Sequence, residues 1–249
     1  MEKYILEACV GSVESALEAA KGGANRLELC GHLIIGGTTP SPFLFKEIRK
    51  LIHIPIHVLI RPRFGDFYYS EYEFRQMMEE AKFFRSLGAE GIVIGMLNKD
   101  GTLDEERMQQ LIDVADGASI TLHRAFDVCR DPYEALETAK RIGINTILTS
   151  GQCNHCLDGK DLIGDLVKQS QGQIDILVGA GVSAKVIKQM YIHTGATSYH
   201  MSGKMTKDSE MIFRKEGVNM GLKSLSEYEI WQTSSRLIEE AKNTLESLN

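Results

Sequence analysis

Short apolar runs alternate with longer amphipathic segments along most of the chain. In the longer segments apolar residues recur at helical spacing, as in Phe74, Met77, Met78, Ala81 and Phe84. The apolar runs predict eight strands, at Tyr4–Cys9, Asn25–Cys30, Pro55–Arg61, Gly91–Leu97, Ser119–Ala125, Asn145–Ser150, Asp175–Gly181 and Thr197–Ser202. Strands that alternate regularly with helices indicate the α/β class and a parallel sheet. Eight such units predict a (β/α)8 TIM barrel, whose typical length of about 250 residues matches this chain.

The pattern changes after the eighth predicted strand. The stretch Gly203–Lys223 is long for a barrel connection, which favours a lid or a contact between subunits, and we expect a homo-oligomer. The amphipathic residues from about Ser224 to Ser247 then predict one long final helix. No Pro/Ser-rich linker interrupts the chain, so we expect residues 1–249 to form a single domain.

Alternation along each strand sorts side chains onto two faces of the barrel wall. In the first strand Leu6 and Ala8 suit packing under helices, which turns Glu7 and Cys9 to the barrel interior. Alternation in the other strands likewise predicts an inward polar set of Glu7, Cys9, Glu28, Cys30, His57, Arg61, His123 and His200. Buried charges are costly unless they are paired, so their convergence at the carboxyl ends of the strands indicates a site.

Composition narrows the class of protein. Apolar residues make up 43% and charged residues 25% of the chain, as in an ordinary globular protein. A formal net charge of −6 argues against nucleic acid as a partner, and no apolar run is long enough for a membrane span. Five cysteines, an odd number, suit free thiols in a reducing compartment, so we expect a cytoplasmic protein.

Two stretches favour binding of a small anion. Arg61 and Arg63 flank a stiff proline and present fixed guanidinium groups suited to carboxylate or phosphate. Gly179, Gly181 and Ser183 follow the seventh strand, where barrels often bind phosphate at a helix start. The alternatives are a structural ion-pair network between the arginines and Glu7 or Glu28, and simple tight packing at the glycines.

Other residues favour proton transfer or metal binding. Glu7, Glu28, His123 and His200 are candidates for acid–base catalysis if the protein is an enzyme, although a histidine alone is more often a hydrogen-bonded core residue. Cys153 and Cys156 form a Cys-x-x-Cys pair after the sixth strand. No second ligand pair or redox-type context accompanies them, so we interpret them as exposed loop thiols.

Several motifs together resemble the CutC family of copper homeostasis proteins. The matching motifs occur in one order across nearly the whole chain: Glu7-Ala8-Cys9, Gly23–Cys30, Gly36–Ser41, Ile60–Phe67, His123–Asp127, Leu148–Gln152 and Gly179–Val182. The resemblance implies a (β/α)8 barrel and cytosolic copper handling, with Cu(I) on the thiols that match Cys9 and Cys30. The Cys153/Cys156 pair is outside the family pattern.

Two functions from different classes follow. The first is copper homeostasis with Cu(I) bound at the barrel mouth by Cys9 and Cys30, since soft thiolates favour Cu(I) over harder ions. The second is a TIM-barrel enzyme that acts on a small anionic metabolite, for example a phosphorylated one. The carboxylates, arginines and histidines exceed what a two-thiol copper site needs, which favours the enzyme. The family resemblance favours copper.

Overall fold

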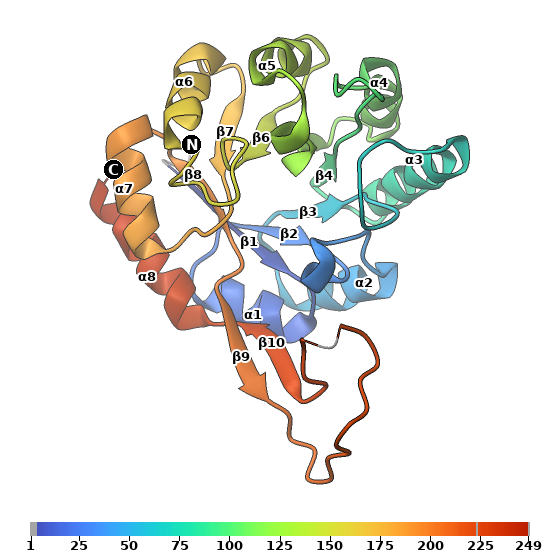
Figure 1. The fold of residues 1–249 in the computed structure, drawn as a ribbon, viewed down its shortest axis with the longest axis vertical. Coiled ribbons are helices and arrows are strands. Elements are labelled where there is room, and N and C mark those ends of the chain that lie inside the picture. Colours follow the sequence, from blue (N-terminus) through green and yellow to red (C-terminus); the bar gives the residue numbers. More distant parts are fainter. Residues whose placement is uncertain (1–3, 223, 249) are drawn as a thin grey trace.

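The computed structural model describes residues 4–222 and 224–248, and it confirms the predicted (β/α)8 barrel. Eight strands close in sequence order, each parallel to its neighbours, and helices surround them (Figure 1). The strands are β1 (Ile5–Val10), β2 (Arg26–Leu29), β3 (Ile56–Leu59), β4 (Gly91–Ile94), β5 (Ser119–Leu122), β6 (Thr146–Thr149), β7 (Asp175–Val178) and β8 (Ser198–Met201). That residues 1–249 form one domain stays a prediction.

The outer helices follow the strands that they cover. They are α1 (Val13–Lys21), α2 (Pro42–Leu51), α3 (Glu71–Ser86), α4 (Glu105–Val114), α5 (Pro132–Arg141), α6 (Lys160–Ser170), α7 (Ala184–Thr194) and α8 (Ser235–Leu248). Two short 3-10 helices, η1 (Leu33–Ile35) and η2 (Arg124–Val128), lie in loops at the carboxyl ends of β2 and β5. Local caps begin the helices: the Ser70 hydroxyl accepts from the Glu73 N–H while the Glu73 carboxylate accepts from the Ser70 N–H.

Most predicted strands extend too far at their carboxyl ends. Regular pairing in β3 ends at Leu59 and in β5 at Leu122, so Arg61 and His123 lie in the loops that follow. The cause is that apolar residues such as Ile60 remain buried after the last residue of the strand. Period-two alternation nevertheless carries far enough past the strand to place both side chains at the barrel mouth.

Between β8 and α8 the chain forms a two-stranded arm. The final helix was predicted from about Ser224, but it begins later because the residues before it belong to this arm. β9 (Lys204–Asp208) pairs antiparallel with β10 (Glu229–Thr233), and helix α8 begins only at Ser235 (Figure 1). The stretch before α8 is a strand because aromatic and β-branched residues suit a pleated ribbon, and the Lys204 ammonium lies 3.5 Å from the Trp231 ring centroid.

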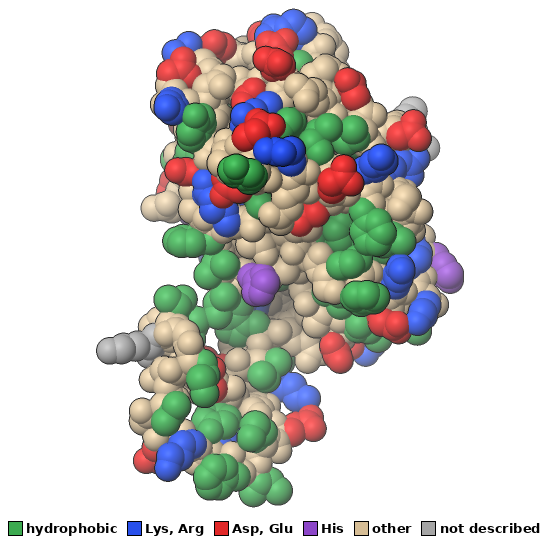
Figure 2. All heavy atoms as spheres, turned by 90° about the vertical axis from the view of Figure 1, so that its right-hand side faces the viewer, with side chains coloured by type: hydrophobic (Ala, Val, Ile, Leu, Met, Phe, Trp, Pro, Cys, Tyr) green, Lys and Arg blue, Asp and Glu red, His purple; other side chains and the backbone are tan. Residues whose placement is uncertain are grey.

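The arm carries exposed apolar side chains. Ile212, Phe213 and Met220 are strongly exposed, and Figure 2 shows hydrophobic side chains gathered on the part of the molecule that projects from the barrel. Lys223, the last residue of the predicted connection, is outside the described residues. A homo-oligomer stays a prediction. None of the helices described is long and apolar enough to cross a lipid bilayer.

Candidate functional site

Six of the predicted polar residues line one cavity of about 320 Å³ at the carboxyl ends of the strands. They are Cys9, Glu28, Cys30, Arg61, His123 and His200. This is the end of a barrel where enzymes place their active sites. The other two members of the predicted inward set, Glu7 and His57, are buried and do not line the cavity.

Glu7 lies at the centre of a buried chain of charged groups. In the strand register it is paired with Arg26 on β2 and with His200 on β8. Its carboxylate accepts a hydrogen bond from Arg26 Nε at 2.5 Å and contacts His200 Nδ1 at 2.7 Å. Glu7 therefore fixes the orientation of the His200 ring, whose Nε2 then faces Glu28 at 3.8 Å.

The charged groups around Glu7 stabilise one another. Burial alone disfavours the Glu7 carboxylate, but Arg26 and His200 outweigh it and hold the pKa of Glu7 far below its usual value. Burial likewise disfavours a charged His200, but Cys9 and Glu28 beside it, with the bond to Glu7, raise its pKa well above the usual value. At neutral pH we therefore assign an imidazolium between two acidic groups.

Glu28 connects these charged groups to the thiols of Cys9 and Cys30. Burial, with the nearby Glu7 charge, raises the pKa of Glu28. The Cys30 Sγ lies 3.2 Å from Glu28 Oε2 and donates to it. Burial and the Glu28 carboxylate raise the pKa of Cys30 well above its usual value, so the thiol is protonated at rest. Cys9 pairs in register with Glu28, which makes Cys9 and Cys30 diagonal neighbours as predicted.

Two kinds of metal donor meet at this place. Three possible ligand atoms lie within 4.8 Å of one another, one each from Glu7, Glu28 and His200. The Cys9 and Cys30 thiols line the same cavity as Glu28 and His200. Thiols are ligands for soft ions such as Cu(I), whereas carboxylates suit harder cations. The donor set fits a soft ion on the thiol side, since each Glu7 oxygen already bonds Arg26 or His200.

Arg61 and Arg63 lie in different environments. Arg61 is buried, and its guanidinium donates to the carbonyl oxygens of Gly36, Gly37 and Gly65. The structure does not bring Arg63 to the cavity lining, because that side chain is held by Glu73 and Asp66 outside it. The neighbouring proline therefore directs the two guanidinium groups to different partners, and neither of them bonds Glu7 or Glu28.

The turn after β7 contributes backbone to the cavity. Ala180 and Gly181 line it, with φ values of 70° and 80° in the left-handed region. A side chain at Gly181 would also collide with the His155 ring. Gly179 and Ser183 are not among the lining residues, and the Ser183 hydroxyl instead caps α7 by accepting from the Val186 N–H at 3.4 Å.

His123 closes the mouth on the β5 side. Its Nδ1 accepts from the Ala125 N–H at 3.1 Å and so begins η2, which assigns the ring proton to Nε2. Burial and the Arg61 charge lower the pKa of His123 to about 3, so the ring is neutral at physiological pH. A neutral ring is a hydrogen-bond donor at Nε2 and not a positive charge.

Asp127 organises the neighbouring loop, a role that the sequence analysis missed. Its carboxylate accepts from the Thr149 hydroxyl at 2.6 Å, from the Ser150 N–H and hydroxyl, and from the Gln152 N–H. It also pairs with Arg124 at 2.6 Å. Asp127 ends the motif His123–Asp127, and these hydrogen bonds join it to the motif Leu148–Gln152.

Cys153 and Cys156 do not form the exposed pair that we predicted. Cys153 is half-buried, but Cys156 is fully buried, and its N–H donates to the Ala180 carbonyl at 3.0 Å. Burial raises the pKa of Cys156 to about 11. The error arose because a polar-looking loop was assumed to be exposed, whereas the Cys156 side chain packs into the apolar core.

Serine substitution should separate the two thiols. Cys156→Ser buries a hydroxyl in the core and should lower the free energy of unfolding by about 1–3 kcal/mol, whereas Cys153→Ser should change it by less than about 0.5 kcal/mol. Urea denaturation of both variants measures this. Equal stabilities would contradict the buried position of Cys156.

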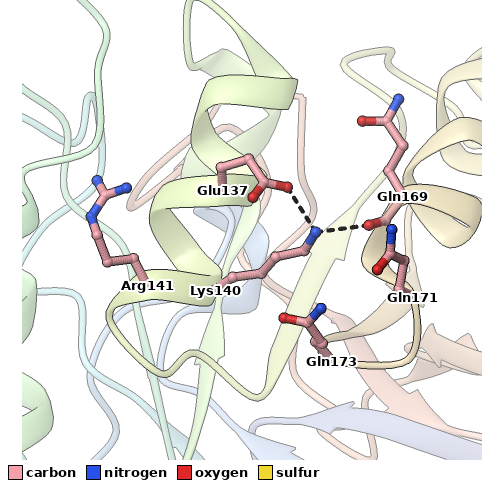
Figure 3. A pocket seen from close by; sticks show the side chains of 6 residues that line it. All are labelled: Glu137, Lys140, Arg141, Gln169, Gln171 and Gln173. Atoms are coloured by element: carbon pink, nitrogen blue, oxygen red, sulfur yellow. Dashed lines mark hydrogen bonds and ion pairs between the residues drawn. The ribbon is translucent and has the colours of Figure 1, made fainter.

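Two other cavities do not bring buried charged side chains together as the cavity at the barrel mouth does. A cavity of about 490 Å³ adjoins the mouth, shares Cys9 with it, and is walled by Trp231 and its neighbours on β10. A groove of about 530 Å³ lies at the opposite end of the barrel, where Lys140 of α5 bonds Glu137 and the Gln169 carbonyl (Figure 3). Its side chains are polar and solvated, so it offers no buried chemistry.

Comparisons with known proteins all point to one family. The model of the CutC family matches residues 4–205. A family protein CutC from Porphyromonas gingivalis is 43% identical over 98% of both chains. The human copper homeostasis protein cutC homolog is 41% identical over 91% of this chain and 84% of its own. The crystal structure of a candidate copper homeostasis protein CutC from Streptococcus agalactiae, 30% identical, superposes with a TM-score of 0.77 over 80% of this chain and 98% of that one.

Proposed function

This chain belongs to the CutC family, and we propose that it acts in copper homeostasis by binding Cu(I) through Cys9 and Cys30. The observation that carries the proposal is that both thiols line one cavity at the barrel mouth as diagonal neighbours, Cys9 on β1 and Cys30 directly after β2. The names of the human and Streptococcus agalactiae relatives support a role with copper. A cytoplasmic location, where thiols stay reduced, is part of the same proposal.

Cu(I) binding in this site must compete with a proton. The Cys30 thiol donates to Glu28 and has a raised pKa, so the ion displaces this proton when thiolate forms. Affinity for Cu(I) should therefore rise with pH. His200, positively charged beside Cys9 and Glu28, offsets the negative charge of two thiolates.

Anaerobic Cu(I) titration against a competing chelator tests the proposal. The wild type should bind one Cu(I) ion, and Cys9→Ser and Cys30→Ser should each weaken binding at least a hundredfold, about 2.7 kcal/mol. Cys153→Ser is the matched control and should bind like the wild type, because that thiol does not line the cavity. Equal affinity in all four proteins would remove the thiol site.

A second candidate function is an acid–base enzyme that acts on a small anion. The observation in its favour is that His200, held by Glu7, faces Glu28 at the cavity wall, an arrangement that a two-thiol site does not require. Glu28 and His200 would exchange protons with a substrate, and Glu7 would be a positioning residue. Native mass spectrometry of protein purified from its own cells distinguishes the two: bound copper supports the first function, and a bound organic anion supports the second.

A further inference from the structure

Arg61 carries a buried positive charge, and no carboxylate of the described residues forms an ion pair with it. Only 7% of the residue is exposed. Its NH1 and NH2 groups bond carbonyl oxygens, which satisfy hydrogen bonds without neutralising the charge. Among the ion pairs of the described residues Arg61 has none, whereas Arg63, two positions away, has two. A buried unpaired charge is costly, and the missing partner is an anion.

A second polar group beside Arg61 also lacks a partner. His123 Nε2, which carries the ring proton, is buried without a hydrogen-bond acceptor in the described part of the chain. The Phe67 ring joins the two residues: its centroid is 4.9 Å from the Arg61 guanidinium carbon and 4.9 Å from the His123 ring centroid. Two donors, one of them charged, are thus fixed next to each other.

The lining of the cavity carries both hydrogen-bond donors and a hydrogen-bond acceptor. Arg61 and His123 supply donors, Arg61 alone of these two supplies positive charge, and the Glu28 carboxylate on β2 supplies an acceptor. Its volume of about 320 Å³ lies at the lower end of the range for small-molecule sites. A matching ligand is therefore small, with an oxyanion at one end and hydroxyl groups at the other.

We propose that this cavity binds a small hydroxylated oxyanion, a hydroxy acid or the corresponding phosphate monoester, with its charged group against Arg61 and accepting a hydrogen bond from His123. The guanidinium is held rigidly by three carbonyl oxygens, so little ordering entropy is lost on binding. Glu28 accepts from the hydroxyl end. This inference extends the second candidate function and does not rest on Cu(I) binding, because the thiols take no part in holding the anion.

Isothermal titration calorimetry at pH 7 in an uncharged or cationic buffer tests the site. The probes are inorganic phosphate, glycerate and glycerol 3-phosphate, with glycerol as the uncharged control. We expect saturable binding of glycerate or glycerol 3-phosphate, with glycerol silent, and the preference between the two distinguishes carboxylate from phosphate. Arg61→Gln should weaken binding at least tenfold. Arg63→Gln, the matched control in the same loop, should change it less than twofold.

Folding is checked by thermal melting, because Arg61 also holds the loop carbonyls. If Arg61→Gln does not fold, His123→Asn decides the matter: its amide oxygen can replace the Nδ1 cap, and binding should weaken at least threefold. Absence of saturable binding to any charged probe, or equal binding in the variants and the wild type, overturns the proposal. Cu(I) affinity in folded Arg61→Gln or His123→Asn should stay within twofold of the wild type, so failure of the anion site and failure of the thiol site are distinguishable.

Discussion

Replacing Glu7 by glutamine should lower the free energy of unfolding by about 3–5 kcal/mol, the usual result of breaking a buried ion pair from one side. The carboxylate is fully buried between Arg26 and His200, at 2.5 Å and 2.7 Å. A neutral amide leaves Arg26 charged and uncompensated in the barrel interior. Urea denaturation, with the midpoint and slope compared with those of the wild type, measures the loss.

A double variant separates the lost charge pair from lost packing. In Glu7→Gln with Arg26→Met the guanidinium is removed together with its carboxylate partner, and the His200 imidazole that remains beside position 7 can lose its proton. Apolar replacements of buried pairs are often neutral or stabilising. We therefore expect the double variant to recover at least half of the stability lost in Glu7→Gln. A single variant destabilised by less than about 1 kcal/mol, a typical loss for an unremarkable substitution, would contradict the role of Glu7.

Mild acid should destabilise the barrel through its two buried neutral histidines. Burial, with Arg26 nearby, lowers the pKa of His57 to about 4, and His123 is lowered to about 3. In the unfolded chain both would take up a proton near pH 6.5. Below that pH the unfolded state binds more protons, so stability falls as the pH drops toward the folded-state values. At about 1.4 kcal/mol per pH unit, each histidine should contribute a loss of about 2 kcal/mol by pH 5.

Differences between variants isolate this effect, since other groups act in the opposite direction. Glu28 and Asp175 have raised pKa values, so their protonation in the folded state adds stability as the pH falls. His57→Gln should therefore lose about 2 kcal/mol less than the wild type between pH 6.5 and pH 5. His53→Gln, at an exposed position, is the control and should follow the wild type. Parallel curves for all three proteins would show that His57 is not held neutral.

The barrel and most of its mouth could be predicted because both depend on local periodicity. Alternation in a short strand puts Glu7 and Cys9 on one face and Leu6 and Ala8 on the other. Once the apolar face packs under the helices, the polar face must point into the barrel. Closure of the barrel then brings the strand ends together, whatever the details of the loops. Alternation and barrel closure together place His200 and Glu28 at the cavity wall, where the structure has them.

The remaining features depend on contacts between distant residues. Alternation could not show that Arg63 would be taken by Glu73, or that carbonyl oxygens of Gly36 and Gly37 would hold Arg61. The arm was missed for a similar reason: Glu229–Thr233 is a strand only because Lys204–Asp208 pairs with it. Helix and strand periods are hard to distinguish in such a short segment.

The most direct test of thiol-based copper binding is copper K-edge X-ray absorption on the protein loaded anaerobically with one equivalent of Cu(I). We predict a reduced copper centre with two sulfur neighbours, which would be Cys9 and Cys30 on adjacent strands. In Cys30→Ser one sulfur neighbour should be lost, while Cys153→Ser should give the spectrum of the wild type. A first coordination shell made only of nitrogen and oxygen would contradict the account, because it would place copper on Glu28 and His200 without the thiols.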